Sequence, residues 1–514
     1  MSKTLTAGTP WRVILVFAVP LLIGNVVQQL YHVIDAMVVG QVLGVNALAA
    51  VGATGSLLFL LLGFAWGMTS GFAIPTAQAF GAKDFAAVKR SVAAGAVLTV
   101  LVSIVMTIGA PLIAEPLLVL MKTPPELLED ATTFAVISFL GAGGTMLFNF
   151  LAAIIRAIGD SKTPLWFLVI ACLFNIVLVV AFVGWLGLGV AGAALATVLA
   201  QVFSVALCLV YVRRSVPALH ISKADLRVSR EELARHLHLG LPMGFQASII
   251  AIGALAVQVR LNTLGSSAVA AYTTAARVDG LAVAFLASLG LAVATFAAQN
   301  YGAGEFDRIR VGVRQSIWIS IGGGLALGLL LVAAGAPIVR SFVGDGAQDV
   351  VEMAHWFLVI NGLMYWVLGL LFVTRNALQG LGQTLVPTMS GVFELVMRVV
   401  AAIILGGMFG FDGIVWSNPL AWIGAAVLLV PAWYSTRKAL GVDLEDNYTQ
   451  DMSATVSVPD TIDVRVAEAM SAERCTDEVR HPAHGVRIEI TTEALEFEAF
   501  EVDLSERELV LAGK

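Results

Sequence analysis

The chain has 514 residues, of which 58% are hydrophobic and 13% charged, and its mean hydropathy is +0.88. Soluble globular proteins are far less apolar, so we expect a multi-pass membrane protein with no nucleic-acid partner. The net charge of −6 is unevenly divided, because residues 440–514 hold 18 of the 36 acidic residues but 6 of the 30 basic ones. A basic membrane part is therefore followed by an acidic tail of different physical character.

Apolar runs long enough to cross about 30 Å of hydrocarbon occur in two groups of six. The first group centres on residues 13–38, 47–74, 92–113, 131–155, 163–184 and 187–212. The second group centres on residues 236–261, 268–297, 311–335, 352–375, 386–408 and 412–436. We therefore expect an all-α membrane protein with twelve transmembrane helices. Its expected parts are an N-lobe (1–212), an inter-lobe loop (213–235), a C-lobe (236–438) and an acidic tail (439–514).

The distribution of lysine and arginine predicts how the chain is oriented in the membrane. With a cytoplasmic N-terminus, the basic clusters between the spans fall on the cytoplasmic side, whereas Lys122 and Arg340 fall on the other. An even number of spans returns the chain to the same side. We therefore expect a cell-membrane protein whose N-terminus and acidic C-terminal tail are both cytoplasmic. Short apolar and acidic alternation near the end of the tail predicts one or two strands there.

The two groups of six spans are repeats of one another. The motif QAFGAKDFAAVK (78–89) returns as QNYGAGEFDRIR (299–310) at an offset of 221 residues, and RAIGDSKTP (156–164) returns as QGLGQTLVP (379–387) at 223. An even number of spans in each repeat keeps both copies in the same orientation, so an axis along the membrane normal relates them. Two such bundles enclose a central cleft, which is the architecture of a transporter.

The first span contains a carboxylate in the stretch YHVIDAMVVG (31–40). Residues three or four apart share a helix face, so Asn25, Gln28, His32 and Asp35 form a polar stripe. A carboxylate at bilayer depth costs about 2.5–3.5 kcal/mol, so such a residue tends to face a cavity and to have a role. The alternative is a place among the headgroups, because Asp35 lies about 34 Å beyond Arg12 along a helix.

These motifs, together with LGVNALAAVG (43–52) and LGLGVAGAALAT (186–197), occur in an order that resembles the multidrug and toxic compound extrusion (MATE) transporters, in particular their DinF-like bacterial branch. The resemblance covers residues 10–438. It implies efflux of drugs or toxic metabolites, driven by inward H⁺ or Na⁺, by two six-helix lobes in alternating access. It implies no enzymatic activity and no cofactor other than the coupling ion.

The resemblance also implies a site in the N-lobe. A first-span aspartate with glutamine and tyrosine before it, here Asp35, Gln28 and Tyr31, is the family's cation or proton site. Asn175 and Thr197 match the amide and hydroxyl that neighbour this aspartate. Relatives often carry a second aspartate where this chain has Val179. The loss of that carboxylate favours H⁺ over Na⁺ as the coupling ion, with Na⁺ as the alternative.

The C-lobe offers fewer candidates. Its first span and residues 356–375 of its fourth contain no aspartate or glutamate, which weakens a sodium site there. Glu394 and Arg398 are four residues apart and are expected to pair, with gating or substrate contact as the alternative role. The further candidates for the lining of a substrate cavity are Gln28, Tyr31, His32, Asn149 and Gln246. For Asn149 the alternative is a hydrogen bond between helices.

The sequence therefore predicts an antiporter that exports organic, cationic or amphipathic small molecules across a lipid bilayer, and we expect a monomer. The rival is a flippase or exporter of a lipid-linked or other endogenous metabolite, which would need several basic residues in the cavity. The spacing of Cys172, Cys208 and Cys475 matches no metal-ligand pattern, so no metal site is expected. No partner for the tail follows from its sequence.

Overall fold

The computed structural model describes residues 4–121, 123–222, 225–343, 348–455, 486–488, 491–492, 495–496 and 500–502. The chain divides into two units, Met1–Asp443 and Leu444–Lys514. Much of the expected acidic tail, and Lys122 of the orientation argument, lie outside the described residues. The two units are described separately below.

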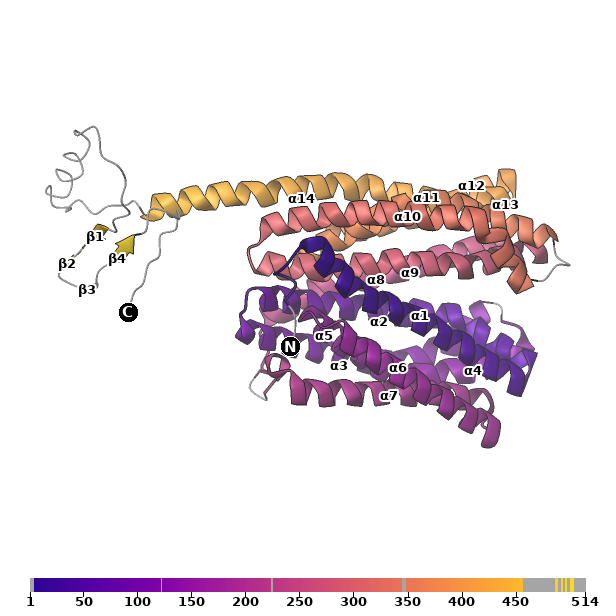
Figure 1. Ribbon diagram of the computed structural model, residues 1–514. Helices are drawn as coiled ribbons and strands as arrows, with labels where there is room; N and C mark the ends of the chain where they lie inside the picture. The colour runs from indigo at the N-terminus through magenta and orange to yellow at the C-terminus, as the bar shows by residue number, and fades with distance from the viewer. Residues whose placement is uncertain are drawn as a thin grey trace. The chain divides into compact units, whose positions relative to one another are not determined.

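Helices make up the first unit, and the N-lobe consists of the first seven of them. They are α1 (Pro10–Leu43), α2 (Val45–Gly81), α3 (Phe85–Leu120), α4 (Pro125–Leu140), α5 (Ala142–Ala157), α6 (Lys162–Val179) and α7 (Gly189–Ser215). One turn of π-helix, η1 (Val180–Trp185), extends α6, and the short 3-10 turn η2 (Pro217–Leu219) follows α7. Figure 1 shows these helices running alongside one another as one layered group.

The C-lobe repeats this arrangement. Its helices are α8 (Arg230–Asn262), α9 (Ser266–Gly302), α10 (Phe306–Val343), α11 (Gln348–Gly380), α12 (Leu385–Phe409), α13 (Phe411–Val415) and α14 (Ser417–Thr455). In the second unit, the described residues form two antiparallel pairs of short strands. β1 (Val486–Ile488) pairs with β4 (Phe500–Val502), and β2 (Thr491–Thr492) pairs with β3 (Leu495–Glu496).

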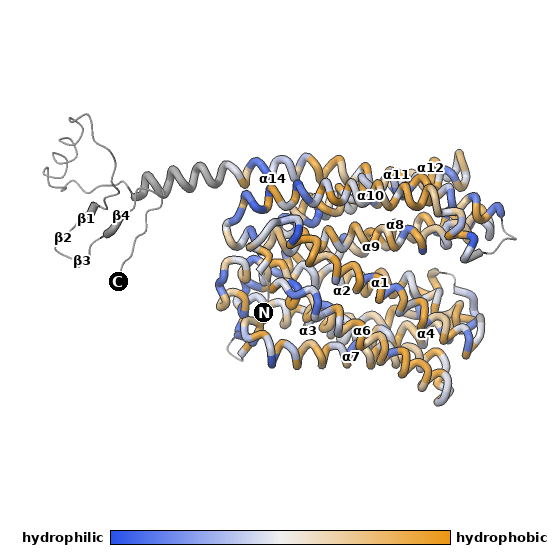
Figure 2. Tube along the Cα trace, in the orientation of Figure 1, coloured by the Kyte–Doolittle hydropathy of each residue, from blue (hydrophilic) through white to orange (hydrophobic). Residues whose placement is uncertain are grey.

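The described residues include eleven helices long and apolar enough to cross a membrane, and twelve spans if α4 and α5 are taken together. The prediction of twelve transmembrane helices is therefore confirmed. The sequence did not predict the 47° bend between α4 and α5. A Cβ atom at Gly141 would overlap Val198 of α7, so the break lies where two helices approach most closely. Figure 2 shows apolar residues filling the middle of the helices and polar ones at both ends.

Backbone geometry at equivalent turns repeats between the two lobes. Gly44 and Gly265 have φ values of 89° and 97°, and Gly159 and Gly382 have values of 88° and 86°. Lys83 has a φ of 59° where the second copy has Gly304 at 73°. The duplication seen in the sequence therefore extends to left-handed turns, one of which is held by a lysine that lacks the freedom of glycine.

The lobes pack against each other through glycines at one end of the bundle. This end carries the α2–α3 and α9–α10 turns with Lys83 and Lys89, and we call it the basic end. A Cβ atom on Gly81 would overlap the carbonyl oxygen of Gln299, and a Cβ atom on Gly302 would overlap that of Gln78. The two repeats thus make the same backbone contact in both directions.

Hydrogen bonds strengthen this contact, again in both directions. Gln78 Nε2 donates to Gly380 O at 3.1 Å, and Gln299 Nε2 donates to Ala157 O at 2.6 Å. The N-terminal segment joins them, because Leu5 N donates to Gln299 Oε1 at 2.8 Å. We call the reciprocal contacts of Gln78 and Gln299 the glutamine clasp.

Away from the basic end, the hydrogen bonds between the lobes stop near the middle of the helices. Asn25 Nδ2 donates to Ser288 Oγ at 2.9 Å, and Ser248 Oγ donates to Leu60 O at 3.3 Å. Among the described residues, no inter-lobe hydrogen bond lies closer to the opposite end. The lobes are therefore fastened together in the basic half of the bundle and separable in the other half.

The glycine contact predicts a large effect for a small substitution. Gly81→Ala should destabilise the fold by about 1–3 kcal/mol, because the new methyl group meets main-chain atoms that cannot move aside as a side chain would. Thermal unfolding of the purified protein in detergent measures this. The matched control is Gly109→Ala in α3, where nothing lies within 4 Å of the added atom. Equal melting temperatures for the two variants would contradict the close approach.

Candidate functional site

Three of the predicted N-lobe residues meet in one hydrogen-bonded cluster. Tyr31 Oη on α1 donates to Thr197 Oγ1 on α7 at 3.1 Å, and Asn175 Nδ2 on α6 donates to the same oxygen at 3.4 Å. Thr197 in turn donates to Ala193 O at 3.2 Å. Asn175 is 1% exposed, so its amide needs such partners inside the lobe. The cluster ties three helices together at one depth.

Asp35 lies one helical turn beyond Tyr31 on α1. Its Oδ1 atom is buried and has no hydrogen-bond partner among the described residues. Thr197 accepts hydrogen bonds from Tyr31 and Asn175, and no hydrogen bond in the described residues joins Asn175 or Thr197 to Asp35. An unpartnered buried carboxylate oxygen is costly when charged, so it has capacity to bind a proton or a cation.

The other N-lobe candidates lie in different surroundings. Gln28 is exposed, and the side chain of His32 is outside the described part of the chain. Asn149 Nδ2 donates to Thr145 O, four residues earlier in its own helix, at 2.9 Å. Val179 packs with other apolar side chains such as Val39 and Val183, so no second carboxylate stands in that place. Position 179 therefore supplies no second acid to the N-lobe.

In the C-lobe, Gln246 belongs to a chain of amides that connects three helices. Gln379 Nε2 on α11 donates to Gln246 Oε1 on α8 at 2.9 Å. Gln246 Nε2 then donates to Pro387 O on α12 at 2.7 Å. Gln246 is 7% exposed, and both its amide nitrogen and its amide oxygen are hydrogen-bonded in these contacts. These two hydrogen bonds fix the side chain of Gln246, which in turn holds the amide of Gln379 in place.

Glu394 and Arg398 pair, as their spacing predicts, and a third charged residue joins them. Arg398 donates to Glu394 Oε1 at 2.9 Å, and Arg375 of α11 donates to Glu394 Oε2 at 2.8 Å. All three side chains are less than a tenth exposed. The sequence placed Arg375 at the end of its span, but α11 continues to Gly380 and keeps Arg375 inside the lobe. One carboxylate therefore holds two buried arginines.

Asp279 on α9 is a further buried contact that the sequence did not reveal. Its Oδ1 atom accepts a hydrogen bond from Tyr365 Oη of α11 at 2.7 Å. The position of Asp279 inside an apolar span indicates that it needs a partner. The sequence does not identify that partner, because Tyr365 is 86 residues away in the chain. Only the packing of α9 against α11 brings the two together.

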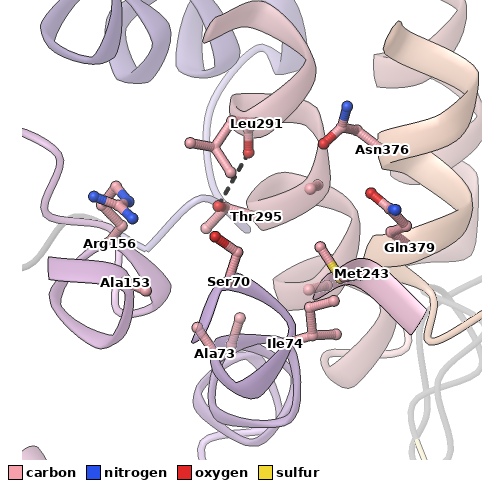
Figure 3. A pocket seen from close by; sticks show the side chains of 13 residues that line it. Ser70, Ala73, Ile74, Ala153, Arg156, Met243, Leu291, Thr295, Asn376 and Gln379 are labelled. Carbon is pink, nitrogen blue, oxygen red and sulfur yellow. Dashed lines mark hydrogen bonds between the residues drawn. The ribbon is translucent and has the colours of Figure 1, made fainter. Parts of the chain in front are cut away.

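A small cavity lies between the lobes, next to the glutamine clasp. Its volume is about 40 Å³, which is room for a few water-sized groups. Most of its lining residues form pairs related by the repeat offset, such as Ala73 with Ala294 and Arg156 with Gln379. The cavity therefore lies at the symmetry axis that relates the two lobes. Figure 3 shows Arg156 on one wall, facing Asn376 and Gln379 on the other.

Arg156 is half-buried and, unlike the buried Arg375 and Arg398, has no acidic partner among the described residues. Among the described residues, no carboxylate lies within ion-pair distance of its guanidinium, and it donates no hydrogen bond. In the sequence Arg156 follows the span 131–155 directly, and nothing in that position indicates that it lines a cavity. No group of three histidine, cysteine, aspartate or glutamate side chains in the described ranges is placed to hold a metal ion.

Comparison with known proteins gives consistent results along the chain. The profile of the MatE family matches residues 20–181 and 242–404, once in each lobe. The probable multidrug resistance protein YoeA of Bacillus subtilis is 31% identical over 433 residues, which cover 82% of this chain and 93% of YoeA. The multidrug export protein MepA of Staphylococcus saprophyticus is 25% identical, covering 83% of this chain and 94% of MepA.

Solved structures show the same fold. A crystal structure of MATE in complex with MaL6 superposes with a TM-score of 0.79 at 24% identity, covering 85% of this chain and 98% of that one. The outward-facing conformation of a multidrug resistance MATE family transporter of the MOP superfamily also gives a TM-score of 0.79 at 24% identity. It covers 84% of this chain and 97% of that one.

The charged triad predicts a strong effect of removing its one carboxylate. Glu394→Gln should destabilise the protein by about 3–5 kcal/mol, because it leaves Arg375 and Arg398 buried without an anion. Thermal unfolding in detergent gives the difference. Glu352→Gln is the matched control, since Glu352 is exposed and accepts a hydrogen bond from Gln348 alone. Wild-type stability of Glu394→Gln would mean that the arginines do not depend on this carboxylate.

Proposed function

Because the chain belongs to the MatE family, whose members are multidrug efflux transporters and not enzymes, we propose that it exports amphipathic organic compounds, cationic ones among them, in exchange for protons. The observation that carries the coupling is Asp35, whose buried Oδ1 atom has no partner among the described residues. In this proposal the protein works as a monomer in the cell membrane, and H⁺ is the only ion that it requires.

Protonation of Asp35 would remove a charge from a low-dielectric site, and that gives the site two states. The charged form is favoured where water reaches it, and the neutral form where the lobe closes around it. Each state biases the lobes toward one side of the membrane, as coupled transport requires. A membrane potential of 100 mV supplies about 2.3 kcal/mol per charge, which supports a gradient of about fiftyfold for a substrate without net charge. One-for-one exchange of a proton for a monovalent cation moves no net charge, so the proton concentration gradient alone drives it.

Two features support a proton over a sodium ion. Tyr31, one turn before Asp35 on the same helix, has its hydroxyl bonded to Thr197. Val179 is buried among apolar residues where a second carboxylate would add oxygens. Hard cations need several oxygen ligands, whereas a proton needs one.

The distribution of basic residues supports a cytoplasmic basic end. Lys83, Lys89 and Arg310 lie there, where the positive-inside rule places them in the cytoplasm. Both ends of the membrane part of the chain would then be cytoplasmic. Since the glutamine clasp closes this same end, the described conformation would face outward.

A flippase for lipid-linked compounds is less well supported. A pyrophosphate needs several cations around it. Arg375 and Arg398 are occupied by Glu394, which leaves Arg156 as the charged residue that lines the described inter-lobe cavity. Drug or metabolite export therefore fits the distribution of charge better.

The test is proton-driven efflux of a cationic dye in proteoliposomes that contain the full chain. Asp35→Asn should abolish transport that depends on the proton gradient, because asparagine does not bind a proton. The control is Asp130→Asn, an exposed aspartate in α4 that should transport as the wild type does. Undiminished gradient-driven transport by Asp35→Asn would rule out this mechanism, and an absolute need for Na⁺ would reverse the choice of ion.

The second unit is expected to matter little for transport. Removal of residues 444–514 leaves the first unit intact, and all the N-lobe and cavity residues above lie within it. Efflux by the shortened chain should stay within about twofold of the wild type, once expression is matched on the membrane. Complete loss of efflux from a folded, inserted protein would instead assign an essential role to the tail.

A further inference from the structure

We propose that the inter-lobe cavity receives an anionic group of the transported compound, held by Arg156, so that zwitterions are among the substrates. This inference rests on the proposed efflux function and names a substrate class for it. The anionic group is a carboxylate or another small acid at one end of the molecule, because a cavity of about 40 Å³ does not enclose a whole drug.

Arg156 is held in place by the contacts between the lobes. It lies in the last turn of α5, one residue before Ala157, whose carbonyl accepts the hydrogen bond from Gln299. The nearest carboxylate in sequence, Asp160, is committed elsewhere. It accepts hydrogen bonds from the Lys162 and Thr163 amides and from Tyr211 Oη. The guanidinium is thus positioned at the cavity but not neutralised.

Arg156 has a guanidinium group suited to binding an anion that enters the cavity. Its five N–H groups form a planar fork that matches a carboxylate or phosphate in two parallel hydrogen bonds. Arg375 and Arg398 show what the chain does with arginines that serve the fold, because both bind Glu394. Arg156 lacks such a partner among the described residues, which leaves its donors for a group that enters from outside.

The opposite wall presents oxygen atoms. Asn376 Nδ2 donates to Phe372 O, and Gln379 Nε2 donates to Gln246 Oε1, so one N–H of each amide is used within the protein and fixes the side chain. Their oxygens are directed toward the cavity (Figure 3), whereas the hydroxyl of Thr295, which also lines it, donates to Leu291 O at 3.2 Å. A matching ligand therefore has an anion toward Arg156 and a hydrogen-bond donor, such as an amine or a hydroxyl, toward the C-lobe wall.

The cavity also explains how such a group would be released. Arg156 comes from the N-lobe, whereas Asn376 and Gln379 come from the C-lobe. Separation of the lobes at the basic end would pull the two walls apart and leave neither half of the site complete. The asymmetry comes from the repeat itself, since position 379 carries glutamine where position 156 carries arginine.

The experiment compares two dyes that differ by one charge. One is a rhodamine with a free carboxylate beside its cationic ring, and the other is the methyl ester of the same rhodamine. Proton-driven efflux of each is measured with the full chain in proteoliposomes. We expect the wild type to transport both, and Arg156→Gln to lower the ratio of acid to ester transport at least about tenfold, or about 1.4 kcal/mol.

Arg156→Gln places at this position the residue that the second repeat has at 379, so it retains a polar side chain. Arg156→Lys keeps the charge without the fork and should give an intermediate ratio. It also serves if Arg156→Gln does not fold. Arg90→Gln, an exposed arginine of the same end outside the cavity, should leave the ratio unchanged.

The outcomes separate the two proposals. Equal loss of acid and ester transport in both Arg156 variants, or no change in the ratio, would overturn the anion site, and so would a wild type that moves the ester but not the acid. A folded wild type that moves neither dye would overturn the efflux function itself. Ester transport by the wild type that falls when gluconate replaces chloride would show that a free anion occupies the site. Arg156→Gln would then transport the ester equally in chloride and in gluconate, and this outcome would overturn a site for the anionic group of the substrate.

Discussion

The contact on which the architecture depends is the close approach of the two lobes at the glutamine clasp. Gly81 and Gly302 let the backbones touch, and Gln78 and Gln299 then reach main-chain carbonyls of the opposite lobe. Each contact that one lobe makes is also made by the other lobe in return. The glutamine clasp therefore lies on the axis that relates the repeats. The cavity with Arg156 lies beside it for the same reason.

The chemistry lies where the two repeats differ. Asp35 falls at an offset of 222 from Val257, which is 1% exposed in the C-lobe and cannot bind an ion. Arg156 corresponds to Gln379, and the buried charge of Glu394 has its partners within the C-lobe. A duplicated scaffold thus supplies symmetric packing, while single substitutions give each lobe its own role.

Two groups of charged side chains within the described lobes have different surroundings. Arg375, Arg398 and Glu394 satisfy one another, so their removal is expected to affect stability first. Asp35 Oδ1 has no hydrogen-bond partner and Arg156 no acidic partner among the described residues, and in the proposed mechanism water or a ligand reaches each during alternating access. The cost of leaving them unpaired is the physical argument that they serve transport.

The sequence by itself determined the membrane class, the twelve spans, the duplication and the position of Asp35, because these follow from hydropathy, offsets and local spacing. It also paired Glu394 with Arg398, which are four residues apart. It did not reveal that Arg375 joins them, that Tyr365 binds Asp279, or that Arg156 faces Gln379 across a cavity. Those contacts join helices far apart in the chain, and only the packing of the lobes brings such residues together.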